Sequence, residues 1–106
     1  MKIQTQNLVI HLVHGTYNVN LVLHKYSNGR TAIKLIDVED GFPVCNATVN
    51  IPDQLLDKNE IIIKNYSENE GMYSELLRLG IISPVVRYAR SGFTSNPVCE
   101  LLITQW

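Results

Sequence analysis

The chain of 106 residues has only two cysteines, Cys45 and Cys99. Two cysteines at this spacing are too few and too far apart for a disulfide framework or a cysteine-based zinc site. Each lies in a run that alternates like a β-strand, PVCNATVN and NPVCELLIT. Because free cysteine is usually buried and inert, we expect two reduced thiols with structural roles.

The sequence also lacks the short motifs of common catalytic and nucleotide-binding sites. It contains no G-x-S-x-G, no Walker loop and no G-x-G-x-x-G. Neighbouring carboxylates occur at Glu39 and Asp40, in an expected turn, and at Glu68 and Glu70, at an expected helix start. Acidic residues are common in both places without any catalytic role. We therefore expect no catalytic residues, no cofactor and no enzymatic activity.

The chain has little charge and no long apolar run. Charged residues make up 18% of the sequence and the formal net charge is −1, so nucleic acid and membrane surfaces are not the expected partners. No stretch approaches the roughly 18 to 20 apolar residues of a membrane-spanning helix. The N-terminal sequence MKIQTQNLVIHLVHG is interrupted by His11 and His14, which is not typical of a signal peptide. We expect one cytoplasmic domain, residues 1–106.

Residues 7–26 alternate between apolar and polar, which predicts a β-hairpin. Gly15 and Thr16 suit a two-residue turn with glycine first. That turn would align three apolar pairs across the hairpin: Leu12 with Val19, Ile10 with Leu21, and Leu8 with Leu23. In this register His11 faces Asn20 and His24 faces Asn7, so the two imidazoles lie about 13 Å apart and do not form a metal site.

The next turn, YSNGR, allows two loop lengths. A two-residue loop would place Leu23 beside Lys34 and break the apolar face. A three-residue loop with Gly29 in the left-handed region instead pairs Leu23 with Ile33 and Leu21 with Leu35. We predict the three-residue loop, because it keeps one face apolar.

The rest of the chain predicts more strands and one helix. Further strand-like runs cover residues 31–37, 44–51, 60–65, 84–92 and 96–104, the last two joined by FTSN. The fold class is therefore α+β: a mostly antiparallel, twisted sheet of about seven strands with one α-helix, about residues 67–79, packed on it.

The segment KNYSENEGMYSELLRLG predicts the helix. Ser67 and Glu70 have the spacing of a capping box, and Gly80 is suited to end the helix. Glu75 and Arg78 are expected to point away from the apolar stripe. Four residues form that stripe: Met72, Tyr73, Leu76 and Leu77. Gly71 costs about 1 kcal/mol relative to alanine inside a helix, so we expect another part of the fold or a partner to approach it closely.

Two surfaces could bind a partner. Five polar or aromatic residues are expected to gather at the helix start as a protein-binding surface: Tyr66, Glu68, Asn69, Glu70 and Tyr73. The second face of the hairpin carries an apolar remainder, which could pack against the helix or form a homodimer seam: Val9, Val13, Val22 and Tyr26. Packing and capping alone would also explain both sets of residues.

An alternative surface lies in the sequence RLGIISPVVRYAR. Arg87, Tyr88 and Arg90 could bind single-stranded nucleic acid weakly, with Tyr88 and Arg90 on the same face of a strand. Arginines that guard an edge strand against aggregation give the same pattern.

Three motifs stand out along the chain: ATVNIPD, IKNYSENEGM and SGF followed by PVC. With their surroundings, roughly residues 30 to 102, they resemble a family of small bacterial proteins of unknown function carried on conjugative elements, plasmids and phages. The resemblance implies no catalytic residues. It implies a mobile-element accessory protein that binds a host protein, such as an inhibitor of a restriction or CRISPR nuclease. A nucleic-acid-binding module and a self-assembling structural protein are the alternatives.

Overall fold

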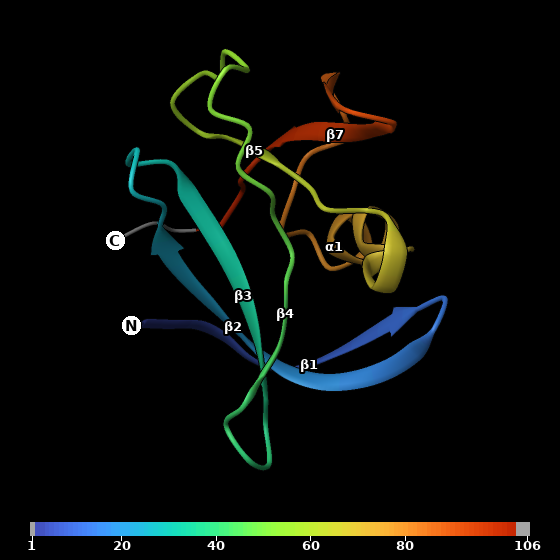
Figure 1. The fold of residues 1–106 in the computed structure, drawn as a ribbon. Coiled ribbons are helices and arrows are strands. Elements are labelled where there is room, and N and C mark those ends of the chain that lie inside the picture. Colours follow the sequence, from blue (N-terminus) through green and yellow to red (C-terminus); the bar gives the residue numbers. More distant parts are fainter. Residues whose placement is uncertain (1, 104–106) are drawn as a thin grey trace.

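The computed structural model describes residues 2–103, with side chains from residue 7 onward. In this part of the chain, strands and helices follow in the order β1 (Lys2–Leu12), β2 (Gly15–Lys25), β3 (Thr31–Asp37), β4 (Pro43–Asn46), β5 (Glu60–Ile62), a 3-10 turn (Ser67–Asn69), α1 (Met72–Arg78), β6 (Arg87–Ser91) and β7 (Thr94–Glu100) (Figure 1). The predicted α+β class, with antiparallel strands and one α-helix, is confirmed. No helix among these residues is long and apolar enough to span a membrane.

The strands form two sheets, whereas the sequence predicted one. The first has the order β1-β2-β3-β4 and the second β5-β7-β6. The predicted strand 44–51 is shorter than expected, because the chain leaves the first sheet after Asn46, and Thr48 forms only an isolated bridge with Ile63, next to β5. A bend at this point lets both sheets contribute to one core with a single short helix.

The register of the first hairpin differs from the prediction. Leu12 pairs with Gly15 and Ile10 with Tyr17, so the turn is Val13–His14 and not Gly15–Thr16. The turn lies there because its backbone is held from outside the hairpin: the Val13 N–H donates to the Glu70 carbonyl at 2.9 Å. The predicted facing residues of His11 and His24 are consequently wrong. His11 pairs with Thr16, and Leu23, the neighbour of His24, pairs with Lys2, so His24 does not lie opposite Asn7.

Gly15 has a packing role in place of the predicted turn role. A Cβ atom at this position would lie 2.8 Å from the hydroxyl oxygen of Tyr17. Real Cβ atoms do not approach other atoms so closely, so a side chain at position 15 would displace the Tyr17 ring from its place beside the backbone.

The second turn follows the prediction. Leu23 pairs with Ile33 and Leu21 with Leu35, and Gly29 has a φ of +85°. The three-residue loop is confirmed. In the last hairpin the turn is Gly92–Phe93, since Ser91 already pairs with Thr94, and the predicted FTSN loop is wrong.

The predicted helix consists of two pieces. The 3-10 turn ends before Gly71, which has a φ of +101°, and α1 begins at Met72. The predicted capping box does not form: Ser67 itself has a φ of +57°, and neither piece has a side-chain hydrogen bond at its cap. The predicted end at Gly80 is confirmed, with a φ of +74° and the Ile81 N–H donating to the Leu76 carbonyl at 3.0 Å.

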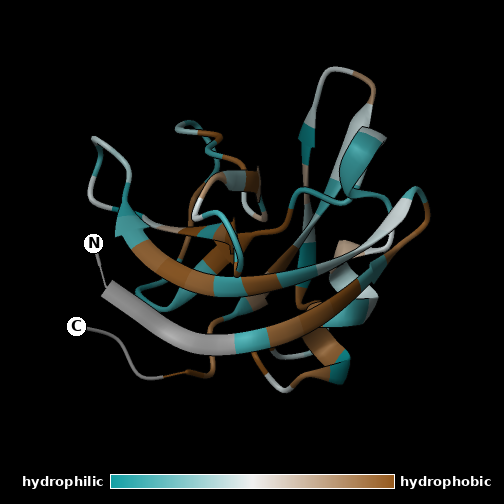
Figure 2. Cartoon of the chain, turned by 90° about the horizontal axis from the view of Figure 1, so that it is seen from below, coloured by the Kyte–Doolittle hydropathy of each residue, from teal (hydrophilic) through white to brown (hydrophobic). Residues whose placement is uncertain are grey.

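The core lies between the first sheet, the second sheet and α1. Hydrophobic residues (brown) run along the long strands of the first sheet in Figure 2. Residues from all three parts pack together, including Ile10, Leu21, Ile33, Ile61, Met72, Leu76 and Cys99. Three valines were predicted to lie on the second apolar face of the hairpin. Val22 is buried, at 1% exposed, whereas Val9 and Val13 are exposed, at 41% and 64%. The surface expected for self-assembly is correspondingly smaller.

Candidate functional site

Residues 70–78, here called the strap, run along the outer edge of β1. The carbonyl of Glu70 accepts the Val13 N–H, the Glu75 Oε1 accepts the His11 N–H at 2.7 Å, and the Arg78 Nη2 donates to the Val9 carbonyl at 3.1 Å. These contacts give hydrogen-bond partners to backbone groups of the first hairpin, which would otherwise be free to pair with another strand. The strap therefore fixes the hairpin tip relative to α1.

Two residues of the strap are shaped by this contact. Glu75 was predicted to point away from the apolar stripe, but it is only 9% exposed and receives hydrogen bonds from His11 and Arg78. The hydrogen bond from Arg78 holds the pKa of this carboxyl below its ordinary value. At Gly71, a Cβ atom would meet the Leu12 Cα and the Val13 nitrogen at 3.6 Å. The predicted close approach to Gly71 is thus made by the hairpin tip.

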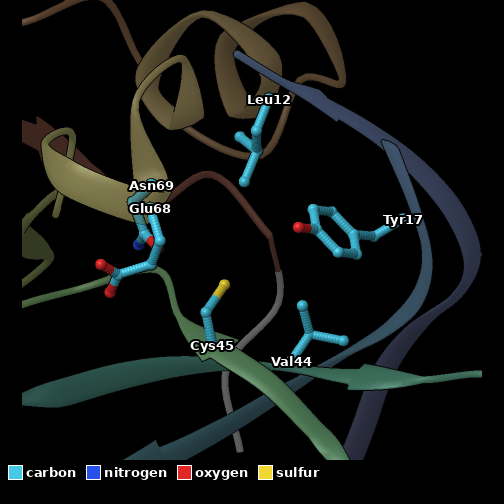
Figure 3. A pocket seen from close by; sticks show the side chains of 6 residues that line it. All are labelled: Leu12, Tyr17, Val44, Cys45, Glu68 and Asn69. Carbon is cyan, nitrogen blue, oxygen red and sulfur yellow. The ribbon is translucent and has the colours of Figure 1, made fainter. Parts of the chain in front are cut away.

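A pocket of about 120 Å³ opens between the hairpin tip, β4 and the 3-10 turn. Its lining residues come from all three: Leu12, Tyr17, Val44, Cys45, Glu68 and Asn69 (Figure 3). Leu12 and Val44 give it apolar walls, and the Tyr17 hydroxyl and the Cys45 sulfur point inward. The pocket therefore combines an apolar interior with a few polar atoms, as binding pockets commonly do.

Asn69 is fully buried at this pocket. Its Nδ2 donates to the Asn46 carbonyl at 2.7 Å, and because a carbonyl oxygen can only accept, this bond fixes the orientation of the amide. The Asn69 Oδ1 is consequently left as an acceptor, buried and with no hydrogen-bond partner in the part of the chain that the structure describes. The oxygen has almost no accessible surface, and the His24 Nε2 and the Asn96 Oδ1 are also buried without a partner among the described residues, so this feature is not particular to the pocket.

Exposed residues flank the pocket and are here called the rim: Val13, His14, Glu68 and Glu70. The Glu68 carboxylate is turned outward to Lys64, whose Nζ lies 2.7 Å away, and Lys64 lowers the pKa of Glu68 to about 2. Glu70 lies 3.7 Å from the His14 Nε2. The side chains of Glu68 and Glu70 are 59% and 58% exposed. The rim thus presents two carboxylates to solvent.

The structure brings together only part of the predicted protein-binding surface. Glu68 and Asn69 line the pocket, and Glu70 lies on the rim. Tyr73 instead has a structural role, since its hydroxyl accepts the Val85 N–H at 3.0 Å. Tyr66 is half-buried, with the Lys64 Nζ 5.5 Å from its ring centre.

The other pocket residues were not singled out from the sequence. Leu12, Tyr17 and Val44 were assigned to strands, and Cys45 was predicted to be a buried thiol. They come from separate segments that meet only in the folded chain. Gly15 is a signal in the sequence, because the absence of a side chain there leaves room for the Tyr17 ring that lines this pocket.

Both cysteines are free, and Cys99 is buried as predicted, whereas Cys45 is only half-buried. Burial raises the pKa of each thiol to about 11. Within residues 2–103, no group of three or more histidine, cysteine, aspartate or glutamate residues is placed to hold a metal ion.

The predicted nucleic-acid-binding residues lie on β6 but are not equivalent. Arg87 donates to both carboxylate oxygens of Glu60 and to the Leu55 carbonyl, so its guanidinium is engaged within the fold. Tyr88 is 57% exposed and shares its face of the strand with the exposed Arg90.

We compared the sequence and the fold with known proteins. No protein-family model, characterised protein or solved structure matches them. The resemblance to a mobile-element family therefore stays a prediction, and the function is inferred from the geometry.

Proposed function

We propose that this is a non-enzymatic binding protein of the cytoplasm, which attaches to another protein through the rim and the pocket. The observation that carries the proposal is the pocket of about 120 Å³ flanked by Glu68, Glu70 and the exposed Val13. Protein interfaces commonly combine a central pocket that excludes water with a polar rim.

The resemblance to a family carried on conjugative elements, plasmids and phages supports the choice of partner. A mobile-element accessory protein would bind a protein of its host. Two rim carboxylates complement a basic surface, and nucleases need a basic surface for their substrate. In its most specific form, the proposal is that the protein inhibits a host defence nuclease of the restriction or CRISPR type.

Affinity capture from nuclease-treated host lysate tests the proposal. The wild-type protein is compared with Glu68→Gln/Glu70→Gln and with a control of equal charge change, Glu39→Gln/Glu100→Gln, whose side chains are exposed elsewhere. A host protein that is retained by the wild type and the control and lost with the rim variant would support the proposal. Equal retention by all three would reject the rim as the binding surface.

A second candidate is weak binding of single-stranded nucleic acid. The observation that favours it is the exposed aromatic pair on the β6–β7 hairpin, Tyr88 at 57% and Phe93 at 108%, near the exposed Arg90. Exposed aromatic rings can stack on bases. Anisotropy with labelled single strands at about 50 and 200 mM salt should then show binding that weakens steeply with salt and is lost in Tyr88→Ala. No binding at the lower salt would exclude it.

A further inference from the structure

We propose that two copies of this chain pair edge to edge through their β6 strands, antiparallel, with Tyr88 of one copy opposite Arg90 of the other. The second sheets of the two copies, each with the order β5-β7-β6, then join into one continuous sheet. The pairing is independent of the proposed function, because β6 contributes no residue to the pocket or the rim.

The outer edge of β6 is open. β6 is the last strand of its sheet and pairs only with β7. The opposite edge of the sheet is covered, because the Val49 N–H donates to the Ile62 carbonyl of β5 at 3.0 Å. Within residues 2–103, no backbone hydrogen bond reaches the outer side of β6 from another segment. An uncovered edge of this kind can pair with a further strand.

The pairing of β6 with β7 shows which groups point outward. Tyr88 lies opposite Pro97, which has no N–H and whose carbonyl accepts the Ile63 N–H on the β5 side. Tyr88 therefore makes no backbone hydrogen bond to Pro97. Hydrogen-bonded and non-hydrogen-bonded pairs alternate along antiparallel strands, so Arg90 makes none to its partner Ser95 either. The N–H and carbonyl groups of Tyr88 and Arg90 thus point toward the open edge.

These outward groups select one register. When the two-fold axis lies at Ala89, Tyr88 meets Arg90 twice, and each pair exchanges both of its N–H···O bonds. An axis at Arg90 would set two arginines directly opposite each other, where they repel. An axis at Tyr88 would pair Arg90 with Val86, whose N–H already donates to the Val98 carbonyl. The edge is therefore complementary to itself around Ala89.

The charged side chains fit this register. Tyr88 is 57% exposed and shares its face of β6 with the exposed Arg90, so each guanidinium can lie over the ring of the other copy. Arg87 is already paired with Glu60. No arginine then lies directly opposite another, and the arginines that could guard this edge do not prevent the pairing.

The ends of the seam bring exposed apolar residues together. Around an axis at Ala89, Val86 of one copy lies opposite Gly92 of the other, next to Phe93. Val86 is 50% exposed and Phe93 is 108% exposed. The pairing thus gives these side chains, as well as Tyr88, a contact that they lack within one chain.

Sedimentation velocity tests the pairing, with loading concentrations from about 5 μM to about 1 mM. The wild type should shift from monomer to dimer over this range. Tyr88→Lys sets a lysine opposite each Arg90 and should weaken dimerisation at least about tenfold, whereas Tyr88→Lys/Arg90→Glu sets opposite charges together and should restore it. A wild type that stays monomeric, equal dimerisation of Tyr88→Lys, or a double variant that is not restored would each overturn the proposal.

Cysteine cross-linking tests the register. Tyr88→Cys and Arg90→Cys, each combined with Cys45→Ser, are incubated with oxidised glutathione, separately and as a mixture. Opposite residues of a hydrogen-bonded pair have Cα atoms about 5.5 Å apart, within disulfide range, whereas diagonal residues are about 7 to 8 Å apart. The mixed disulfide should therefore form at least about fivefold faster than either symmetric one. Equal rates would overturn the proposal.

Hydrogen exchange distinguishes a second copy from another occupant. In the wild type, protection of the Tyr88 and Arg90 amides should rise with protein concentration, because each donates to the other copy. A protein that stays monomeric and protects these amides only when it holds a captured host protein would assign the edge to that protein, and the proposal would fail.

Discussion

The Glu75 carboxylate accepts the backbone N–H of His11, 64 residues earlier in the chain, at 2.7 Å. A helix side chain thereby takes the place that a backbone carbonyl would have in a neighbouring strand. With the Glu70 carbonyl and the Arg78 guanidinium, it covers an edge of the first sheet that would otherwise be open to pairing with another chain.

The Glu75→Ala substitution should lower the free energy of unfolding by about 2 kcal/mol, because the His11 N–H loses its acceptor at a partly buried position. Urea denaturation measures the loss, and hydrogen exchange should show that the His11 amide is no longer protected. The neighbouring Ser74→Ala, at an exposed position, should change stability by less than about 0.5 kcal/mol. An unchanged urea midpoint for Glu75→Ala would contradict this role.

Gly71→Ala should be more destabilising than Gly80→Ala. Gly71 has a φ of +101°, well beyond the left-handed region that other residues tolerate, whereas Gly80 has a φ of +74°, close to that region. We expect losses of about 2 and about 1 kcal/mol respectively. Thermal or urea denaturation of the two variants checks the order, and a reversed order would show that backbone strain does not dominate at Gly71.

Stability should fall in acid because of two ion-paired carboxyls. Hydrogen bonds from Arg87 and Arg78 lower the pKa values of Glu60 and Glu75 below their ordinary value of 4.5. The unfolded chain therefore binds protons first, so this stabilisation is present above about pH 4.5 and is lost as the pH falls through the lower folded values.

Urea midpoints between about pH 6 and pH 3 measure this loss. The Glu60→Gln/Glu75→Gln variant should be less stable than the wild type at neutral pH and should lose less stability over the same interval. Parallel pH profiles for the two proteins would assign the acid sensitivity to other groups.

Both cysteines should react slowly with iodoacetamide in the folded protein. Burial raises their pKa to about 11 from an ordinary value of 9.0, which lowers the thiolate fraction about 100-fold at pH 8. Mass spectrometry of native and urea-unfolded samples compares the rates. Cys45, which is half-buried, should react before the fully buried Cys99. Labelling of either cysteine at the unfolded rate would contradict the assignment.

The turn after β2 could be predicted because two local signals agree there. Gly29 permits the positive φ, and the apolar pattern places Leu23 opposite Ile33. The turn before β2 carries a similar local signal at Gly15, but its position depends on the bond between Val13 and Glu70, which joins distant segments. Local pattern cannot show a contact of that kind.

The candidate site was accessible to sequence reasoning only in part. Glu68, Asn69 and Glu70 are adjacent in the chain, so they stood out as a cluster. The sequence did not show that these residues have different roles. Asn69 is buried, whereas Glu68 and Glu70 are exposed. The opposite wall, with Tyr17 and Cys45, depends on the register of one hairpin and on where β4 ends.

The strap has a consequence for how the chain folds during synthesis. The first hairpin leaves the ribosome long before residues 70–78, because the contacts of β1 with Glu75 and Arg78 span 64 and 69 residues. Until then, the N–H and carbonyl groups along the outer side of β1 have no cover and can pair with another nascent chain. Contacts of such long sequence separation also slow folding. The interval between synthesis of the hairpin and arrival of the strap is therefore the period in which this protein is most open to misassembly.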